Sequence, residues 1–242
     1  MGRLLRHGAF GAVLLGPALC AAASGAADAV GTVGGLTPTV RLLVGLSLLS
    51  FVPAALIAMT SFTRIVVTLS FLRHALGMPE TPPTAVLITL SAFLTFFTMA
   101  PVLESGYDEG VAPFLDGRLD ARTAFERASA PLRRFMAAHV RAEDLSAVAE
   151  LAHARPAEPA AETGLQVLAP AFMLSELRAA FVAGFLIFLP FLLIDLVVAA
   201  VLMALGMMMV PPTSIALPLK VLLFVLIDGW SLLLRAIAGA YA

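Results

Sequence analysis

Six ionisable residues lie within or beside the long apolar stretches of this sequence, and they are the first candidates for chemistry. They are Arg64, Glu176, Arg178, Asp195, Lys220 and Asp228. A charge inside a membrane-spanning helix is costly, so such residues either pair with one another or mark a path for ions or protons. Pairing that holds helices together is the simplest interpretation of each one alone. Asp195 has no cation within one helical turn of it in the sequence, so its partner must come from another helix, another subunit or water.

Asp195 and Asp228 fall in neighbouring apolar spans, as the two carboxylates of an intramembrane aspartyl protease do. Such a pair also needs a pocket open to water and close approach of the two groups. The Gly-x-Gly-Asp and Tyr-Asp contexts of that chemistry are absent around these two residues, and the chain has no His-Glu-x-x-His, Walker or Gly-x-Gly-x-x-Gly motif. The single cysteine, Cys20, excludes a cysteine-rich metal site and an internal disulfide framework. We therefore expect neither an enzyme nor a cofactor.

Glu176 and Lys220 are candidates for a pair of opposite charges. Glu176 precedes the third apolar span of the sequence, and Lys220 begins the fourth. The two side chains could meet across a hairpin or across a boundary between subunits.

Three consecutive methionines, Met207, Met208 and Met209, follow the third apolar span and precede two prolines. Three neighbours in a row cannot all face one core at helical spacing. Methionine is unbranched and polarizable, so it packs against irregular and changing surfaces. One interpretation is a tight turn whose methionines face lipid or core. The other is a flexible apolar seal, in which several copies form a ring that deforms around a passing chain, because hydrophobic constrictions block water and ions.

The composition indicates that the elements which position these residues lie partly in a membrane. Of the 242 residues, 60% are hydrophobic and 13% are charged, and the mean hydropathy is +0.98. A soluble domain is usually about 45–50% apolar and about 25% charged, so part of this chain needs a bilayer as its solvent. The net charge of −1 gives no indication of nucleic-acid binding.

The spacing of the apolar stretches predicts an all-α membrane protein of kinked helical hairpins with about four apolar spans. The first pair of helices is expected in residues 40–103 and the second pair, with the Met-rich loop, in residues 165–242; the spans cover about 40–59, 84–103, 179–205 and 215–237. About 20 helical residues are enough to cross a bilayer. Pro53 and Pro190 favour kinks. The sequence stays apolar beyond Arg64, which favours a bent or re-entrant helix there.

Residues 1–27 have the pattern of a secretory signal peptide. Arg3, Arg6 and His7 form a basic start, and a short apolar run and small residues follow. The alternative is a short first membrane helix, but the run is too short to span about 30 Å of hydrocarbon. Residues 28–39 are then a linker, and the mature amino terminus lies outside the cytoplasm.

Residues 104–164 form a polar segment between the second and third spans. It holds Glu104 and ten more of the chain's sixteen acids, together with seven arginines. Its apolar residues recur at helical spacing and predict one or two amphipathic helices; they are Phe125, Leu132, Phe135, Met136, Val140, Leu145, Val148 and Leu151. We interpret its acids as a solvated face rather than a ligand site. With the amino terminus outside, this segment is expected in the periplasm.

Several motifs, taken jointly and in order, resemble the flagellar export-gate family FliP. The run Ser61-Phe62-Thr63-Arg64 is one of them, and the matches cover residues 59–67, 69–73, 75–77, 81–83, 94–97, 99–101, 170–172, 175–177, 184–188, 190–192, 194–198, 206–209, 211, 217–218, 220 and 228–230. Homologues in virulence secretion systems share much of this pattern. The signal peptide and the form of the Ser61 run favour the flagellar branch. Each motif alone is weak, whereas the series over residues 40–234 is specific.

The resemblance implies a pore-forming subunit of the type III export gate in the inner membrane, at the flagellar basal body. It implies a homo-oligomer, a pentamer, that assembles with FliQ, FliR and other export-apparatus membrane proteins and passes unfolded flagellar subunits. It also implies that Met207 to Met209 form the pore constriction and that Glu176 and Lys220 bridge adjacent subunits. The alternative function is a secondary transporter or ion channel that uses Asp195. Such transporters usually show internal symmetry, which is absent here.

Overall fold

The computed structural model describes residues 57–154, 160–207 and 209–241, with the single positions 43, 46, 47, 50 and 54. The predicted signal peptide (1–27), the linker (28–39) and more than half of the first predicted span (40–59) lie outside the described residues. Every regular element in the described part of the chain is helical, so the prediction of an all-α protein is confirmed.

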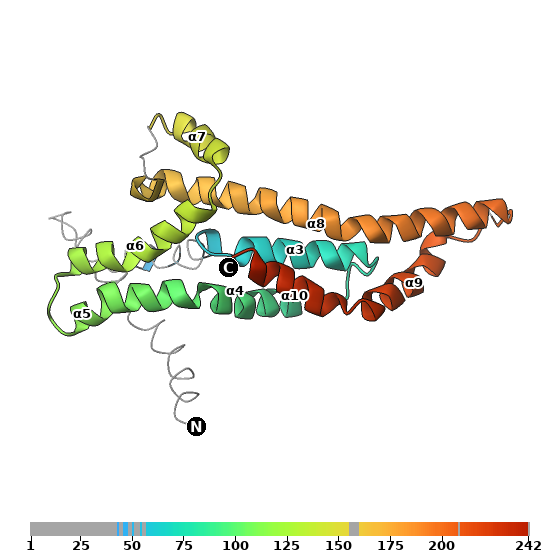
Figure 1. Cartoon of the computed structure of the whole chain (residues 1–242), viewed down its shortest axis with the longest axis horizontal. Coiled ribbons are helices and arrows are strands. Elements are labelled where there is room, and N and C mark those ends of the chain that lie inside the picture. Colours follow the sequence, from blue (N-terminus) through green and yellow to red (C-terminus); the bar gives the residue numbers. More distant parts are fainter. Residues whose placement is uncertain are drawn as a thin grey trace, which may run out of the picture.

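Helix α8 (Leu165–Ala204) forms the long axis of the molecule (Figure 1). It has 40 residues, which at 1.5 Å per residue makes it about 60 Å long. The predicted apolar span at about 179–205 forms the later part of this helix, which begins at Leu165 and continues through Pro170 and Pro190. It ends in a Schellman motif: Gly206 has φ 74°, and the Met207 N–H donates to the Leu202 carbonyl at 2.9 Å.

Helix α3 (Phe62–Ala75) packs along α8. The two backbones approach closely at Gly184, where an added Cβ would lie 2.4 Å from the Phe71 ring. The chain then turns through Gly77, at φ 78°, and a proline-rich loop. The apolar run beyond Arg64 is therefore a helix of its own that begins at Phe62.

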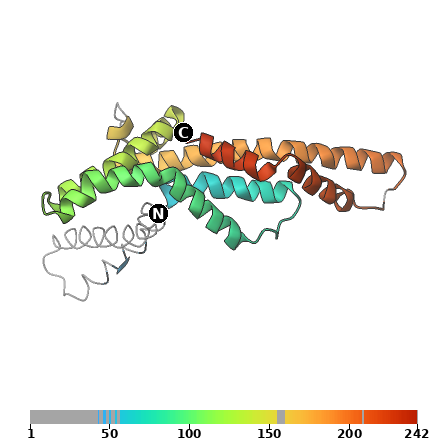
Figure 2. The same ribbon diagram turned by 60° about the horizontal axis from the view of Figure 1, so that its bottom comes forward.

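Helix α4 (Thr84–Gly106) returns past α3 and continues through a π-helical turn, η1 (Tyr107–Val111), into the short helix α5 (Ala112–Leu115). The predicted span at about 84–103 agrees with α4, and the helical run continues beyond it to Leu115. Pro101 lies inside α4, and the run bends along its length (Figure 2).

Helices α6 (Ala121–His139) and α7 (Ala142–Leu151) follow, and a 3-10 turn, η2 (Ala160–Glu162), precedes α8. Asp120 caps α6 by accepting a hydrogen bond from the Thr123 N–H. Gly110 lets η1 approach α6, because a Cβ there would lie 2.5 Å from the Ala128 nitrogen. Phe125 and Leu151, which the helical pattern placed on buried faces, are 62% and 82% exposed.

The last apolar stretch is broken into α9 (Pro212–Leu226) and α10 (Gly229–Gly239), which are bent by 64° relative to each other. The break is at Asp228, whose φ of 50° is left-handed. The fourth span, predicted at about 215–237, is therefore not one continuous helix but two. Two helical runs in the described chain, Thr84–Leu115 and Leu165–Ala204, are long and apolar enough to cross a membrane, or three if the broken pair counts as one. The predicted number of four is not confirmed.

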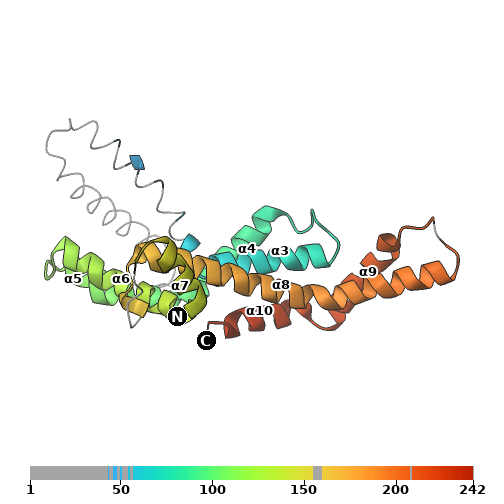
Figure 3. The same ribbon diagram turned by 90° about the horizontal axis from the view of Figure 1, so that it is seen from above.

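Three apolar clusters hold these helices together, and the smallest joins α8 to α9 through Val198, Leu202 and Ala216. One of the two larger clusters joins α3, α8, α9 and α10 around Leu69, Phe191 and Phe224. The other joins α4, α6, α7 and α8 around Met136 and Phe172. Helix α9 folds back along the C-terminal part of α8, which leaves the turn between them at the far end of the molecule (Figures 1 and 3).

Candidate functional site

Glu176 is at the centre of a buried polar site in α8. It is 0% exposed. Its Oε1 accepts a hydrogen bond from Arg64 Nη2 of α3 at 2.7 Å, and its Oε2 accepts one from the Tyr241 hydroxyl at 2.5 Å. A carboxylate in an apolar interior is stable only when its oxygens are partnered. Here both oxygens are satisfied within one chain.

Tyr241, next to the last residue of the chain, closes this site. Arg64 Cζ lies 4.7 Å from the centroid of its ring, a cation–π distance, and the rings of Phe135 and His139 lie 5.9 and 5.3 Å away. Burial and the negative charge of Glu176 raise the pKa of the Tyr241 phenol. The phenol is therefore neutral and donates to Glu176. Residues from α3, α6 and α8 thus converge on the end of the chain.

Lys220 and Asp195 form a second ion pair, nearer the middle of the long hairpin. Lys220 Nζ of α9 lies 2.6 Å from Asp195 Oδ2 of α8, and the lysine is buried. The amine also lies 4.0 Å from the position that a Cβ on Gly77 would take, just beyond the C-terminus of α3, where a helix favours positive charge. Asp195 Oδ1 is buried without a hydrogen-bond partner among the described residues.

Glu176 and Lys220 do not pair with each other in the single chain. The partner of Glu176 is Arg64, and the partner of Lys220 is Asp195. The partner of Asp195, which the sequence left open, comes from another helix of the same chain. A contact between Glu176 of one copy and Lys220 of the next is not tested by the single chain and stays a prediction.

A third polar contact joins α7 to α8. Asp144 is buried; its Oδ2 accepts from the Ser175 hydroxyl at 2.8 Å, and its Oδ1 lies 3.4 Å from Arg178 Nη2. The Arg141 N–H donates to the Ser175 oxygen at 3.1 Å. The interpretation that the acids of residues 104–164 form a solvated face is therefore wrong for Asp144, which has a structural partner on each oxygen.

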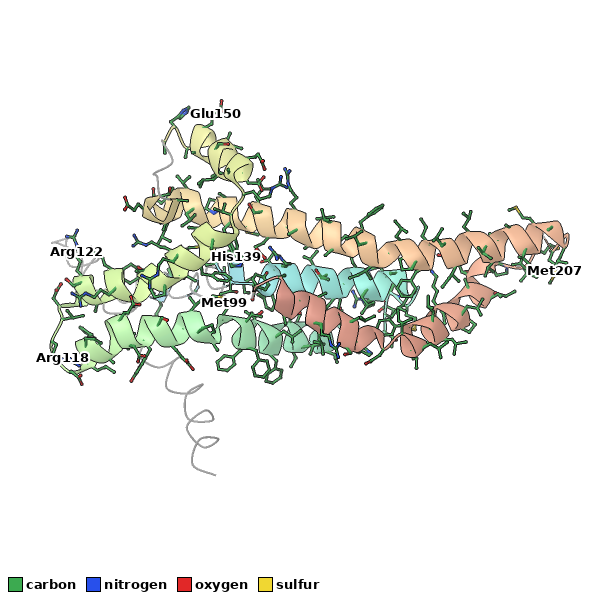
Figure 4. All side chains as sticks on the ribbon, viewed as in Figure 1. Met99, Arg118, Arg122, His139, Glu150 and Met207 are labelled. Carbon is green, nitrogen blue, oxygen red and sulfur yellow. The ribbon has the colours of Figure 1, made fainter. Side chains whose placement is uncertain are left out.

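The methionine turn lies between α8 and α9, at the tip of the molecule (Figure 4). Met207 is 43% exposed and Met209 is 98% exposed, whereas Met208 lies outside the described residues. Gly206 ends α8, and Pro211 and Pro212 start α9, so the turn is short and fixed at both ends. The tip of the hairpin thus displays Met209 almost completely and Met207 in part.

The described residues show no arrangement for catalysis or metal binding. No group of three or more His, Cys, Asp or Glu side chains among them could hold a metal ion. Asp195 is paired with Lys220, whereas Asp228 is exposed at the break before α10. The two aspartates that suggested a protease therefore have different surroundings.

Sequence reasoning missed Tyr241 and His139 as members of the Glu176 site. Both are outside the apolar spans, and no short motif contains them. The costly burial of Arg64 and Glu176 was visible in the sequence, but their pairing depends on how α3 packs on α8. The same is true of Asp144, since only its contact with Ser175 distinguishes it from the exposed acids around it.

Comparisons with known proteins find similar sequences over most of the chain. The model of the FliP family matches residues 45–237. The flagellar biosynthetic protein FliP of Pectobacterium carotovorum is 52% identical over 205 residues, which are 85% of this chain and 80% of that protein. The Caulobacter vibrioides protein of the same name is 50% identical over 93% of this chain and 83% of its own length. The Bacillus subtilis protein is 45% identical over 85% and 93%.

Proposed function

The chain belongs to the FliP family of flagellar biosynthetic proteins, and on this premise we propose that it is a pore-forming subunit of the flagellar type III protein export gate. Several copies, as a pentamer, assemble with FliQ, FliR and other membrane proteins of the export apparatus in the inner membrane. The assembly passes unfolded flagellar subunits. The observation that carries this proposal is the exposed methionine turn at the tip of a long apolar hairpin.

The length of α8 supports assembly with further protein. The helix is about 60 Å long, whereas the hydrocarbon core of a bilayer is about 30 Å thick. A typical tilt of about 20° does not remove this difference. Large apolar side chains are nevertheless exposed from Met173 through Phe185 to Met203, which is about 45 Å of the helix. Lipid covers only part of this surface, so other subunits cover the rest.

The methionine turn supplies the constriction of the pore. In a ring of copies, Met207 to Met209 of each copy point at the axis from the ends of their hairpins. Their side chains carry no charge and have three rotatable bonds, so they close on one another and exclude water and ions. The same flexibility lets them move apart around an unfolded chain. No bond is made or broken in this step.

Glu176 and Lys220 are the proposed contact between neighbouring copies. Each has a partner within its own chain, at 2.7 and 2.6 Å. Pairing between copies therefore adds the neighbour's Lys220 to Glu176, which keeps Arg64, and takes that lysine away from its own Asp195. A fully buried charge left without a partner is costly, but the Asp195 side chain is 35% exposed, so water solvates its carboxylate after the exchange.

A transporter or channel that uses Asp195 is the second candidate, because Oδ1 of this residue is buried without a partner. Lys220 lies 2.6 Å from the other oxygen and already neutralises the carboxylate. A cation would have to compete with the lysine for this site. The ion pair therefore favours a structural role for Asp195.

Purification in mild detergent tests the proposed function. Co-expression with FliQ and FliR should give a ring-like complex that contains several copies of this chain and both partners, which size-exclusion chromatography and electron microscopy would reveal. A monomer that carries solute across liposome membranes, with neither partner bound, would contradict the proposal and favour the transporter.

A further inference from the structure

Glu176 is inaccessible in the single chain. It is 0% exposed, and each of its oxygens has a partner, Arg64 for Oε1 and Tyr241 for Oε2. A neighbouring copy cannot touch this carboxylate unless one of the covering groups moves. The inference below rests on the proposed contact between Glu176 and a neighbouring copy.

The two covering groups differ in how firmly they are held. Arg64 is in the first turn of α3, whose Ile65, Leu69 and Leu72 are buried in the main apolar cluster. Tyr241 follows the end of α10 and belongs to no helix. Moving Arg64 would disturb α3, whereas moving Tyr241 displaces residues that lie outside the helices.

Helix α10 also begins at a strained bend. It meets α9 at an angle of 64° through Asp228, a non-glycine residue with φ of 50°. A left-handed conformation at such a residue is uncommon and costs energy. The arm formed by α10 is therefore fixed at one end by this bend and at the other by the contacts of Tyr241 (Figure 1).

We propose that Tyr241 is a removable cap on Glu176, which keeps the free subunit closed and which a neighbouring copy displaces on assembly. The incoming group is the ammonium of the neighbour's Lys220, which takes the place of the phenol hydroxyl at Oε2. Arg64 keeps its bond to Oε1, so the carboxylate is never left without a cation. The phenol leaves as the neutral, protonated group, so the exchange requires no proton transfer.

A cleavable cross-link tests this cap directly. In full-length protein with Cys20→Ser, His139→Cys and Tyr241→Cys, a short bis-methanethiosulfonate reagent should join residues 139 and 241, because the rings of His139 and Tyr241 are neighbours in the closed chain, with centroids 5.3 Å apart. We expect the cross-link in the monomeric fraction and its near absence from the oligomeric fraction. Cross-linked monomer should enter the oligomer only after reduction. An equal yield of cross-link in oligomer and monomer overturns the cap and leaves the proposed function standing, whereas a reduced protein that never forms an oligomer overturns both.

Tyr241→Phe provides a second test without new cysteines. The variant keeps the aromatic ring but loses the hydrogen bond to a buried charge, which weakens the closed form by about tenfold or more. It should therefore form the oligomer at an about tenfold lower protein concentration than the unmodified chain. Tyr107→Phe, at the only other tyrosine of the chain, should assemble as the unmodified chain does. Assembly of Tyr241→Phe at an unchanged or higher concentration overturns the cap.

Discussion

At the scale of single residues, the molecule depends on charges that are buried with a partner. Arg64 and Glu176 join α3 to α8, and Lys220 and Asp195 join α9 to α8. Removing one member of such a pair strands the other in an apolar interior, whereas replacing both by neutral groups of similar size is often harmless. The two ion pairs are therefore best tested by substitutions made singly and together.

Arg64→Met should lower the free energy of unfolding by about 3–5 kcal/mol, because it leaves Glu176 buried without its cation. The double variant with Glu176→Gln should recover most of the loss, since no charge then remains. Arg134→Met is a matched control, because Arg134 pairs with Glu109 at 2.9 Å on the exposed surface, where a pair contributes about 0–1 kcal/mol. Denaturant unfolding in detergent measures all three. Additive losses in the double variant would contradict the buried pair.

The raised pKa of Tyr241 predicts a loss of stability in alkali. In the folded chain, burial and Glu176 keep the phenol protonated, whereas in the unfolded chain it ionises near its ordinary value of about 10. The stabilisation is therefore fully present below about pH 10 and is lost as the pH rises above that value. Thermal unfolding between pH 8 and 11 should show a steeper decline for the unmodified chain than for Tyr241→Phe. Parallel curves would show that Tyr241 is not held in its neutral form.

The sequence predicted which residues are costly to bury, but not which residues they contact. Arg64, Glu176, Asp195 and Lys220 all stand out because they interrupt or border apolar runs. Arg64 and Glu176 are 112 positions apart in the chain, and Asp195 and Lys220 are 25 positions apart. Contacts at such separations are fixed by helix packing. Tyr241 has no such signal, since a tyrosine after an apolar helix is unremarkable by itself.

At the scale of the elements, small residues decide how closely the helices approach. Gly184 lies against Phe71 where α3 packs on α8, and Gly110 lies against Ala128 where η1 packs on α6. In both places a Cβ would overlap atoms of the neighbouring helix. The spacing of α3 from α8 in turn sets the distance between Arg64 and Glu176, so packing at a glycine controls the polar site.

Gly184→Ala should destabilise the protein by about 1–3 kcal/mol, as overpacking of a close contact does. The added Cβ would lie 2.4 Å from Cγ and Cδ2 and 2.9 Å from Cβ of Phe71, so rotating the ring alone does not relieve the overlap. Gly164→Ala, just before α8, has no atom within 4 Å of the added carbon and serves as the control. Unfolding by denaturant compares the two. Equal stability of both variants would contradict the close packing of α3 on α8.

The existence of the apolar helices was predictable, but their limits were not. Hydropathy finds an apolar core of a helix, whereas α8 begins earlier because Val167, Leu168, Ala171 and Phe172 are buried against α6 and α7. No proline lies beside Asp228 from which the break could have been predicted. The bend brings Tyr241, after α10, back to Arg64 and Glu176.

At the scale of the whole molecule, one end is polar and the other is apolar. The turn around Arg118 and the helices α6 and α7 lie at one end of the long axis, and the methionine turn lies at the other (Figure 4). In the proposed assembly the charged end is periplasmic, and the hairpins of α8 and α9 converge on the pore axis. Subunit number and partners follow from contacts between chains, which a single sequence specifies only through family resemblance.

The proposed orientation is tested by labelling a cysteine at Arg127, an exposed position of α6. In the Cys20→Ser background, Arg127→Cys should react with a membrane-impermeant thiol reagent added to intact cells whose outer membrane is permeable. The periplasmic location of residues 104–164 predicts this result. Labelling that occurs only after the inner membrane is opened would place the segment in the cytoplasm and reverse the topology.

The central claim is that the methionine turn seals the export gate, and ion leakage through the assembled gate measures this most directly. Cells that carry the joint substitution of Met207, Met208 and Met209 by Ala should show a raised ion permeability of the inner membrane, because the shorter side chains leave an open, wettable gap. Met203→Ala, at an exposed methionine of α8 before the turn, should leave the permeability at the level of the unmodified chain. Unchanged permeability together with unchanged flagellar export in the triple variant would contradict the seal.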